Sequence, residues 1–268
     1  MRVGLVTDVH YADKETAGNR HYRDSLGRLS SAIDHFNELE ADVVVELGDF
    51  IDAASSVEQE LSWLEQIEAV YARVRCPRHY VLGNHCVFTL TKEQFLSRCG
   101  IGSSYYSFDV GSFHFIVLDA CFRQDGQPYG EKNSNWTDAN VPPDQLAWLR
   151  TDLRAARHPT IVFVHQRLDV DNHYGIRQRV EVRRELEASG KVLAVFQGHN
   201  HVNDLKDINR IHYCTLAAMV DADTNAYGLL TLHPNGAMGL DGYDRQESWS
   251  LAPATQKAGA VHSPASRC

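Results

Sequence analysis

Short apolar runs alternate with segments of helical periodicity along most of the chain. Runs rich in Val, Ile, Leu and Phe predict buried β-strands, and apolar residues that recur at helical spacing predict amphipathic helices. The predicted strands are Val3–Thr7, Val43–Leu47, His79–Leu82, Phe113–Leu118, Thr160–Val164, Val192–Phe196, Ile211–Leu216, Gly228–Leu232 and Met238–Tyr243. The predicted helices are Asp24–Leu39, Val57–Val74, Lys92–Arg98 and Asp144–Ala156.

This order of elements favours an α/β fold. Strands that alternate with helices build sheets whose outer faces are covered by the helices. The last three predicted strands have no helix between them and predict an antiparallel end. We therefore expect two sheets packed face to face. Because no Pro- or Ser-rich linker divides the 268 residues, we expect one domain over residues 1–252.

Two long polar segments and the C-terminal tail interrupt this regularity. Residues 123–143 and 169–179 lack periodicity, and connections of this kind are usually functional lids or mobile loops. In the second segment, His173, Tyr174, Arg177 and Arg179 are candidates to reach a substrate, with His173 favoured; a solvated loop position is the alternative for each. The tail, residues 253–268, is rich in Ala, Pro, Ser and Gly and is expected to be disordered.

Seven polar side chains stand where predicted strands end. In open α/β sheets, ligands bind beyond the carboxyl ends of the strands, so we expect these side chains to meet on one rim. Their mixture of carboxylate, amide and imidazole groups suits Mn, Fe or Zn ions. Calcium prefers oxygen ligands, and structural zinc usually takes thiolates. The seven residues are Asp8, His10, Asp49, Asn84, His165, His199 and His201.

The same set can be divided between two divalent metal ions. Two ions about 3.5–4 Å apart need a ligand that bridges them, and Asp49 is the expected bridge. A hydroxide held between the ions is then the expected nucleophile. Two carboxylates against two divalent ions leave a charge of about +2, which attracts phosphate. One ion is expected to take Asp8, His10 and His201, and the other Asn84, His165 and His199.

Each of these residues also has a plainer interpretation. A lone Asp at a strand end is commonly a helix N-cap, and a lone His is commonly a hydrogen-bonded core residue. However, Gly-Asp at 48–49, Gly-Asn-His at 83–85 and Gly-His-Asn-His at 198–201 all follow predicted strands. Capping alone does not explain that combination, so the metal hypothesis is favoured.

Composition narrows the partners. The chain has 26 basic and 35 acidic residues and a formal net charge of -9, which argues against a broad binding surface for duplex nucleic acid. We expect a small, nucleotide-like phosphorylated substrate that is attracted by the metal charge. The apolar run before Asp8 is too short for a signal sequence, and no stretch reaches transmembrane length. The expected location is therefore cytoplasmic, with no membrane partner; the sequence does not indicate the oligomeric state.

The six cysteines include no CxxC pair and no regular spacing, so we expect free thiols and no disulfide framework. Cys86 differs from the others because it directly follows His85 in the predicted site. A nearby metal ion can lower a thiol pKa, so we expect Cys86 to be sensitive to oxidation.

These motifs resemble those of the calcineurin-like metallophosphoesterase superfamily. Its pattern D-x-H, G-D-x-x-D, G-N-H, H and G-H-x-H is matched by Asp8/His10, residues 48–52, residues 83–85, His165 and His199/His201. The resemblance implies a four-layer αββα sandwich of two mixed sheets with helices outside. It also implies that Asp49 and His85 are catalytic, with His85 contacting the phosphate and helping the leaving group to depart.

Two departures from the superfamily pattern narrow the interpretation. Purple acid phosphatases have Tyr at the position of Ile51, so that class is excluded. Most members have Asp or Glu after Gly-Asn-His, where this chain has Cys86. Without that carboxylate, His85 is left with two alternatives: Asp52 or a loop residue replaces the missing partner, or His85 acts as a neutral hydrogen-bond donor.

A narrower resemblance is to the manganese-dependent ADP-ribose/CDP-alcohol diphosphatase branch. It rests on residues 19–26, Asn-Arg-His-Tyr-Arg-Asp-Ser-Leu, and on 115–120 with its Leu-Asp-Ala end. It implies that Tyr22 stacks on a base or sugar and that Arg23 pairs with phosphate. The alternative is that both side chains merely cover the sheet edge. One departure is that the branch can have Gln where this chain has His10.

We therefore expect a metal-dependent hydrolase of phosphodiesters or nucleotide-type phosphoanhydrides, acting through a metal-bridging hydroxide that attacks phosphorus. A phosphomonoesterase with the same dinuclear centre is the nearest alternative, and space for a second ester group distinguishes the two. A metal-binding scaffold without catalysis and a DNA-processing nuclease are further alternatives. The complete ligand set disfavours the scaffold, and the acidic composition disfavours the nuclease.

Overall fold

The computed structural model describes residues 1–253, which form five α-helices and twelve β-strands. The helices are α1 (Asp24–Glu38), α2 (Val57–Tyr71), α3 (Lys92–Cys99), α4 (Pro143–Ala155) and α5 (Arg179–Ser189). The strands are β1 (Arg2–Val6), β2 (Val43–Glu46), β3 (Arg78–Tyr80), β4 (Tyr106–Val110), β5 (Phe113–Val117), β6 (Thr160–Phe163), β7 (Val192–Gln197), β8 (Asp204–Ile208), β9 (Ile211–Thr215), β10 (Ala226–Leu232), β11 (Met238–Asp244) and β12 (Trp249–Leu251).

The strands form two mixed sheets of six strands each. The first has the order β12-β11-β10-β1-β2-β3, and the second has the order β4-β5-β6-β7-β9-β8. The neighbours β1-β2-β3 and β5-β6-β7-β9 are parallel, whereas the remaining pairs are antiparallel. Parallel neighbouring strands place their carboxyl ends on the same edge of a sheet. In open α/β sheets this is the edge, or rim, at which ligands bind.

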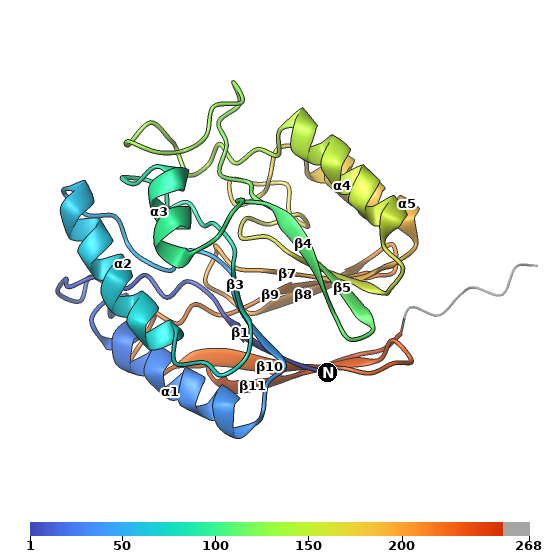
Figure 1. The fold of residues 1–268 in the computed structure, drawn as a ribbon, viewed down its shortest axis with the longest axis horizontal. Coiled ribbons are helices and arrows are strands. Elements are labelled where there is room, and N and C mark those ends of the chain that lie inside the picture. Colours follow the sequence, from blue (N-terminus) through green and yellow to red (C-terminus); the bar gives the residue numbers. More distant parts are fainter. Residues whose placement is uncertain (254–268) are drawn as a thin grey trace, which may run out of the picture.

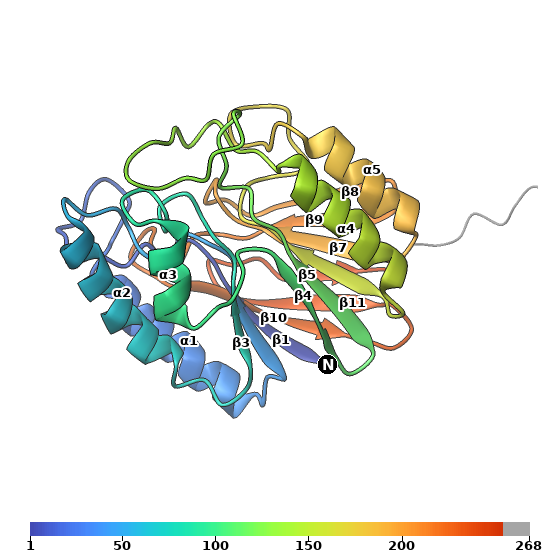
Figure 2. The same cartoon turned by 45° about the horizontal axis from the view of Figure 1, so that its top comes forward.

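Helices α1, α2 and α3 cover the outer face of the first sheet, and α4 and α5 cover that of the second (Figures 1 and 2). Strand β1 shows how its residues divide between the two faces. Val3 and Leu5 pack in the core between the sheets, whereas Val6 packs toward the helices. A Cβ at Gly4 would lie 2.9 Å from the Phe36 ring, so α1 approaches the strand closely. The expected four-layer αββα sandwich is confirmed.

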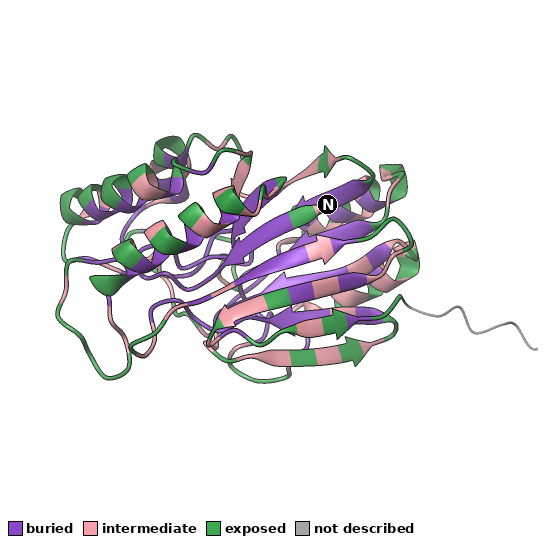
Figure 3. Ribbon diagram, turned by 90° about the horizontal axis from the view of Figure 1, so that it is seen from below, coloured by how far each residue is buried: buried purple, intermediate pink, exposed green. Residues whose placement is uncertain are grey.

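Burial follows these layers. The central strands are almost wholly buried, while the helices expose their outward faces (Figure 3). A third core lies between the second sheet and α4 and α5, where Val162 packs with Leu149 and Leu186. Among the helices of residues 1–253, none is long and apolar enough to span a bilayer.

The structure adds elements that the hydrophobic pattern does not predict. Helix α5 buries only Val182 and Leu186 among mostly charged residues, so its periodicity is weak. Strands β4 and β8 are sheet edges, and β12 has only three residues. The predicted antiparallel end is correct for β10 and β11, whereas β9 lies in the other sheet, where it is parallel to β7 and antiparallel to β8. The expectation of a disordered tail falls on residues outside those described, apart from Pro253.

One buried ion pair anchors α3 to the end of β5. Lys92 is 6% exposed and Asp119 is fully buried, and their charged groups are in direct contact. The Lys92 ammonium also lies 3.2 Å from the centroid of the Phe122 ring. Asp119 accepts a hydrogen bond from the backbone N–H of Cys121 at 2.8 Å. The pair therefore fixes the start of the 123–143 loop.

We predict that Asp119→Ala destabilises the fold by roughly 3–5 kcal/mol, because it leaves the Lys92 charge buried without a partner. Urea unfolding followed by circular dichroism measures the change. The matched control is the double variant Lys92→Met/Asp119→Leu, which removes both charges and should recover most of the loss. Equal destabilisation by the single and double variants would show that the unpaired charge is not the cause.

Candidate metal centre

All seven predicted ligand residues lie beyond the carboxyl ends of strands, on one rim. Asp8 and His10 follow β1, and Asp49 follows β2. Asn84, His165 and the 199–201 segment follow β3, β6 and β7 in the same way. Segments far apart in the sequence are therefore brought together by the parallel strands, as the strand-end pattern predicts.

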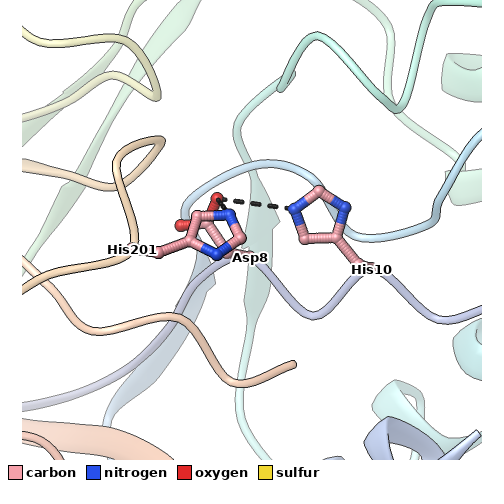
Figure 4. A group of neighbouring side chains, drawn as sticks. All are labelled: Asp8, His10 and His201. Carbon is pink, nitrogen blue, oxygen red and sulfur yellow. Dashed lines mark ion pairs between the residues drawn. The ribbon is translucent and has the colours of Figure 1, made fainter. Parts of the chain in front are cut away.

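Three groups of potential ligand atoms form within this rim: one joins His10, Asp52 and His85, and the other two consist only of predicted ligand residues. Asp8, His10 and His201 form the first of these two clusters, and Asp49, His165 and His199 form the second; within each, the ligand atoms lie within 4.8 Å of one another. In the first cluster, Asp8 Oδ1 is 3.7 Å from His10 Nε2 and 3.3 Å from His201 Nε2, and Figure 4 shows the two imidazoles converging on this carboxylate.

Asp49 stands between the two clusters. Its Oδ2 lies 3.5 Å from His10 Nε2 and 3.1 Å from His165 Nε2, so one oxygen atom faces a histidine of each cluster. Its other oxygen, Oδ1, accepts a hydrogen bond from the backbone N–H of His85 at 2.7 Å. This placement is the one that a bridging carboxylate requires.

Several atoms of this rim that could coordinate a metal ion are buried without hydrogen-bond partners. They include Asp8 Oδ1, His10 Nε2, Asn84 Oδ1, His165 Nε2 and His199 Nε2. A buried polar atom with no partner costs about 1–3 kcal/mol, and such atoms are rare singly. Five of them converging from the ends of four strands fit a cationic ligand, because each lone pair would then be satisfied by a metal ion.

The backbone at these positions is strained. Residues with a side chain seldom adopt positive φ, because Cβ then crowds the backbone. Strain of this kind tends to concentrate where function requires a particular side-chain direction. Five of the seven predicted ligand residues nevertheless have positive φ: Asp8 (50°), His10 (45°), Asp49 (57°), His199 (76°) and His201 (63°).

The glycines of the three motifs make room for the ligands. A Cβ at Gly48 would lie 2.5 Å from His165 Nδ1, and one at Gly83 would lie 2.2 Å from Asp49 Oδ1. A Cβ at Gly198 would lie 2.5 Å from Asp8 Oδ2. Each glycine therefore allows a neighbouring strand to bring its ligand close, which explains why the motifs read Gly-Asp, Gly-Asn-His and Gly-His.

Neighbouring groups orient the imidazoles. His165 Nδ1 donates to the backbone oxygen of Leu47 at 2.9 Å, which leaves Nε2 free as an acceptor. His201 Nδ1 lies 3.0 Å from Asp221 Oδ2. Partners of this kind fix the tautomer and direction of metal-binding histidines. Asp221 was not predicted as a site residue, although it follows the apolar run 216–220 much as the other ligands follow their strands.

Electrostatics keep the two predicted carboxylate ligands charged. Burial opposes ionisation of Asp8, but His201 and His10 outweigh it and hold its pKa well below the ordinary value. Burial also opposes ionisation of Asp49, whose pKa is lowered by His165 and His85. Glu46 lies beneath them and is different, because burial and then Asp49 raise its pKa well above the ordinary value.

His201 and His199 differ in charge in the absence of metal. Burial disfavours protonation of His201, but Asp8 and Asp221 outweigh it and raise its pKa to about 10. Burial and the neighbouring His165 lower the pKa of His199 to about 3. A metal ion at the first cluster must therefore displace a proton from His201, whereas His199 is already neutral.

Asp52 takes the place of the carboxylate missing after Gly-Asn-His. Its Oδ1 lies 2.5 Å from His85 Nδ1 and 3.6 Å from His10 Nδ1. Lys14 Nζ donates to the other oxygen, Asp52 Oδ2, at 2.7 Å. Burial opposes ionisation of Asp52, but His10 and His85 outweigh it and lower its pKa. Of the two alternatives for His85, the geometry favours a carboxylate partner.

The expectation that Cys86 is reactive is wrong. Its side chain is fully buried, and its Sγ accepts a hydrogen bond from the Phe50 N–H at 3.2 Å. Burial, followed by the charges of Glu46 and Asp49, raises the thiol pKa well above its ordinary value. The residue after His85 points into the core beneath the site, which the sequence spacing does not reveal. The other described cysteines are also free thiols.

The structure changes the predicted substrate contacts. Tyr22 is only 9% exposed and packs in the core between the first sheet and its helices. Arg23 pairs with Asp13 and Glu15 at the surface, outside the cavity of the metal centre. Arg20, from the same 19–26 segment, lines that cavity instead. Burial disfavours its charge, but Tyr22 and Asp52 outweigh this and raise its pKa.

Aromatic residues from the two long loops form the outer wall. The ring centroids of Trp136 and Tyr174 lie 5.6 Å and 5.7 Å from that of His199. His173, predicted to contact substrate, is exposed and packs 5.4 Å from Trp136 at the edge of this group. Tyr174 is one of the loop residues expected to reach a substrate, and it lines the cavity over the cluster. Trp136 was not predicted as a site residue, because an aromatic side chain isolated in a polar loop is a weak signal without coordinates.

Two cavities meet at this wall. One, of about 410 Å³, opens over the metal cluster and is lined by Arg20, Asp49, Asn84, His85, Trp136, Tyr174, His199, Asn200 and His201. The other, of about 300 Å³, is lined by Ala53, Asn84, His85, Phe88, Ser134, Asn135 and Trp136. They share Asn84, His85 and Trp136, so space for a ligand extends on both sides of His85.

Known proteins with similar sequences share most of their length with this chain. A manganese-dependent ADP-ribose/CDP-alcohol diphosphatase from Arabidopsis thaliana is 25% identical over 301 residues, covering 91% of this chain and 94% of the relative. The diphosphatase of the same name from Homo sapiens is 32% identical over 303 residues, covering 88% of each protein.

The crystal structure of a dimetal phosphatase from Danio rerio superposes with a TM-score of 0.84 at 21% identity, covering 95% of this chain and 99% of that one, and shows the same fold. The family model described as calcineurin-like phosphoesterase matches residues 1–203, which include all seven predicted ligand residues. Since that match covers most of the chain, the protein belongs to the calcineurin-like phosphoesterase family.

Proposed function

We propose that this protein hydrolyses phosphodiesters or nucleotide-type phosphoanhydrides at a centre of two divalent metal ions. The observation that supports this best is the pair of clusters joined by Asp49, whose Oδ2 lies 3.5 Å and 3.1 Å from a histidine of each. Asp8, His10 and His201 would hold one ion, and Asn84, His165 and His199 the other. The ions would supply a hydroxide nucleophile at neutral pH and neutralise charge on the phosphoryl oxygens.

The residues around the clusters have separate roles in this proposal. Hydrolysis replaces the P–O bond of the leaving group by a bond to the oxygen of water, and the departing oxygen takes up a proton. His85 faces the shared part of the cavities and is oriented by Asp52, so it would donate to that oxygen. Arg20 would pair with a non-bridging phosphoryl oxygen, because it is the arginine that lines the metal-side cavity.

The local charge suits an anionic substrate despite the net charge of -9. Asp8 and Asp49 are the charged ligands, because neighbouring histidines hold the pKa of each carboxyl below its ordinary value. Two divalent ions would therefore leave the cluster at about +2, to which Arg20 adds a further positive charge. Attraction of phosphate is then a local effect of the rim and does not need a basic protein surface.

Space on both sides of His85 supports a diester or diphosphate over a monoester. A phosphomonoester has one organic group, whereas cavities of about 410 Å³ and 300 Å³ flank the shared residues. The similar proteins from Arabidopsis thaliana and Homo sapiens are named as manganese-dependent diphosphatases of ADP-ribose and CDP-alcohols. We therefore infer that manganese is a suitable metal and that nucleotide-type diphosphates are suitable substrates for this chain.

Substitutions of Asp49 and His85 separate metal binding from proton transfer. With metal-stripped protein reconstituted with manganese, Asp49→Asn should abolish hydrolysis of bis(p-nitrophenyl) phosphate and reduce the bound metal, because both clusters lose a ligand. His85→Ala should retain two metal ions and lower kcat roughly 100- to 10,000-fold. Turnover rates and elemental analysis provide both readouts. Full activity with two metal ions in Asp49→Asn would refute the bridging role.

Substitutions of Arg20 and Arg23 distinguish the roles of these two arginines. Arg20→Ala should lower kcat/KM for bis(p-nitrophenyl) phosphate by about 10- to 100-fold, because a charged hydrogen bond to phosphate is lost. Arg23→Ala is the matched control and should change kcat/KM by less than about twofold, since exposed ion pairs contribute little. Steady-state kinetics of both variants decide the matter. The reverse ranking would restore the contact first expected for Arg23.

Metal binding at the first cluster should release a proton from His201. The pKa of His201 is raised to about 10, so this histidine is protonated at neutral pH and must lose its Nε2 proton to bind a metal ion. Manganese affinity should therefore increase with pH, by about tenfold per unit below that pKa. Calorimetric titrations in buffers of different ionisation enthalpy measure the released proton. Asp221→Asn should reduce the release, and affinity that does not change between about pH 7 and pH 9 would contradict the prediction.

A further inference from the structure

Trp136 is an exposed aromatic residue to which the hydrolytic proposal assigns no role. Its side chain is 42% exposed, although an indole gains much by burial. It lies in the 123–143 loop, which contributes none of the proposed metal ligands. Trp136 lines both cavities. We call the cavity over the metal cluster the metal-side compartment and the other cavity the second compartment.

The two compartments differ in chemistry. The metal-side compartment contains the carboxylate of Asp49, the guanidinium of Arg20 and the metal-binding imidazoles. The second compartment has no carboxylate and no Lys or Arg in its wall, where Ala53, Phe88 and the indole provide apolar surface. Ser134 and Asn135 add hydrogen-bonding groups. Apolar walls with a few polar groups are typical of sites for flat organic rings.

The loop holds the indole in a defined place. The backbone N–H of Lys132 donates to the oxygen of Phe88 at 2.6 Å, which ties the loop to the wall of the second compartment. The hydroxyl of Tyr129, a residue only 1% exposed, donates to the oxygen of Asn135 at 3.1 Å. Trp136 directly follows this anchored segment. An aromatic ring held in this way can stack on a ligand at a small cost in conformational entropy.

We propose that the second compartment binds the leaving group of the substrate, and that this group carries a flat aromatic or heterocyclic ring stacked on Trp136. The proposal rests on the hydrolytic function above. The leaving group is assigned to this side because His85, which would donate to the departing oxygen, lines the compartment, whereas Arg20 lines only the metal side. Trp136 thereby determines specificity for the leaving group.

The kinetic test compares Trp136→Ala and Trp136→Phe with the parent, using bis(p-nitrophenyl) phosphate, whose leaving group is a flat ring. Trp136→Ala should raise KM about tenfold, the scale of lost ring stacking, and Trp136→Phe should lie between it and the parent. Competitive inhibition by inorganic phosphate, which has no ring, should be unchanged in both variants. An unchanged KM, or a phosphate inhibition constant that rises in parallel with KM, would overturn the proposal.

A binding test uses the purified protein without turnover. Adenosine should quench part of the tryptophan fluorescence in a saturable manner, whereas ribose should not. The quench should disappear in Trp136→Phe and persist in Trp148→Phe, the matched control on α4, whose indole lies 5.0 Å from Tyr105. Absence of a quench in the parent, or its persistence in Trp136→Phe, would refute ring binding. If adenosine binds as described and no ester is hydrolysed, the proposed function fails while the ring site stands.

Discussion

The carboxylate of Asp49 is the contact on which the whole rim depends. It faces a histidine of each cluster through one oxygen and accepts the His85 N–H through the other, so the ends of β1, β2, β3 and β6 meet at a single side chain. The negative charge also explains why imidazoles that would repel one another when protonated can be packed together. Burial at this depth makes every one of these interactions stronger than it would be in water. The two sheets must therefore place the carboxyl ends of these strands next to one another.

That requirement has a cost in the backbone, which the fold offsets. Five predicted ligands have left-handed φ, and three glycines accept neighbours that no other residue would tolerate. Such strain persists only where surrounding structure determines the conformation. Here the turns after β1 and β2 are joined by backbone hydrogen bonds, Asp8 N–H to the Gly48 oxygen at 3.0 Å and His10 N–H to the Asp49 oxygen at 2.7 Å. The apolar core between the sheets holds the strands beneath these turns in place. Packing in this core therefore offsets the strain in the backbone of the rim.

The sequence predicts best what depends on strands. Alternating apolar runs led to an α/β fold with two packed sheets. The motifs led to the αββα layers, the family, the phosphoesterase activity and the pair of divalent metal ions, all of which are confirmed. The diphosphatase resemblance is supported by relatives that cover most of the chain. Features that depend on three-dimensional packing were missed. Helix α5 has too few buried residues to show a period, Cys86 turns into the core one residue after His85, and Arg20 rather than Arg23 enters the cavity. Loop geometry decides each of these, and periodicity carries no information about it.

The separation of the metal ligands from the 123–143 loop has an evolutionary consequence. The residues expected to break the bond come from strand ends that are tied into the core, whereas Trp136 comes from a loop outside the strands and helices. Insertions and substitutions in such a segment leave the catalytic scaffold intact. Descendants of this protein can therefore exchange one organic substituent for another by remodelling a loop, while the hydrolytic chemistry is inherited unchanged. The same division makes the loop the natural place for an engineer to alter substrate range without rebuilding the metal centre.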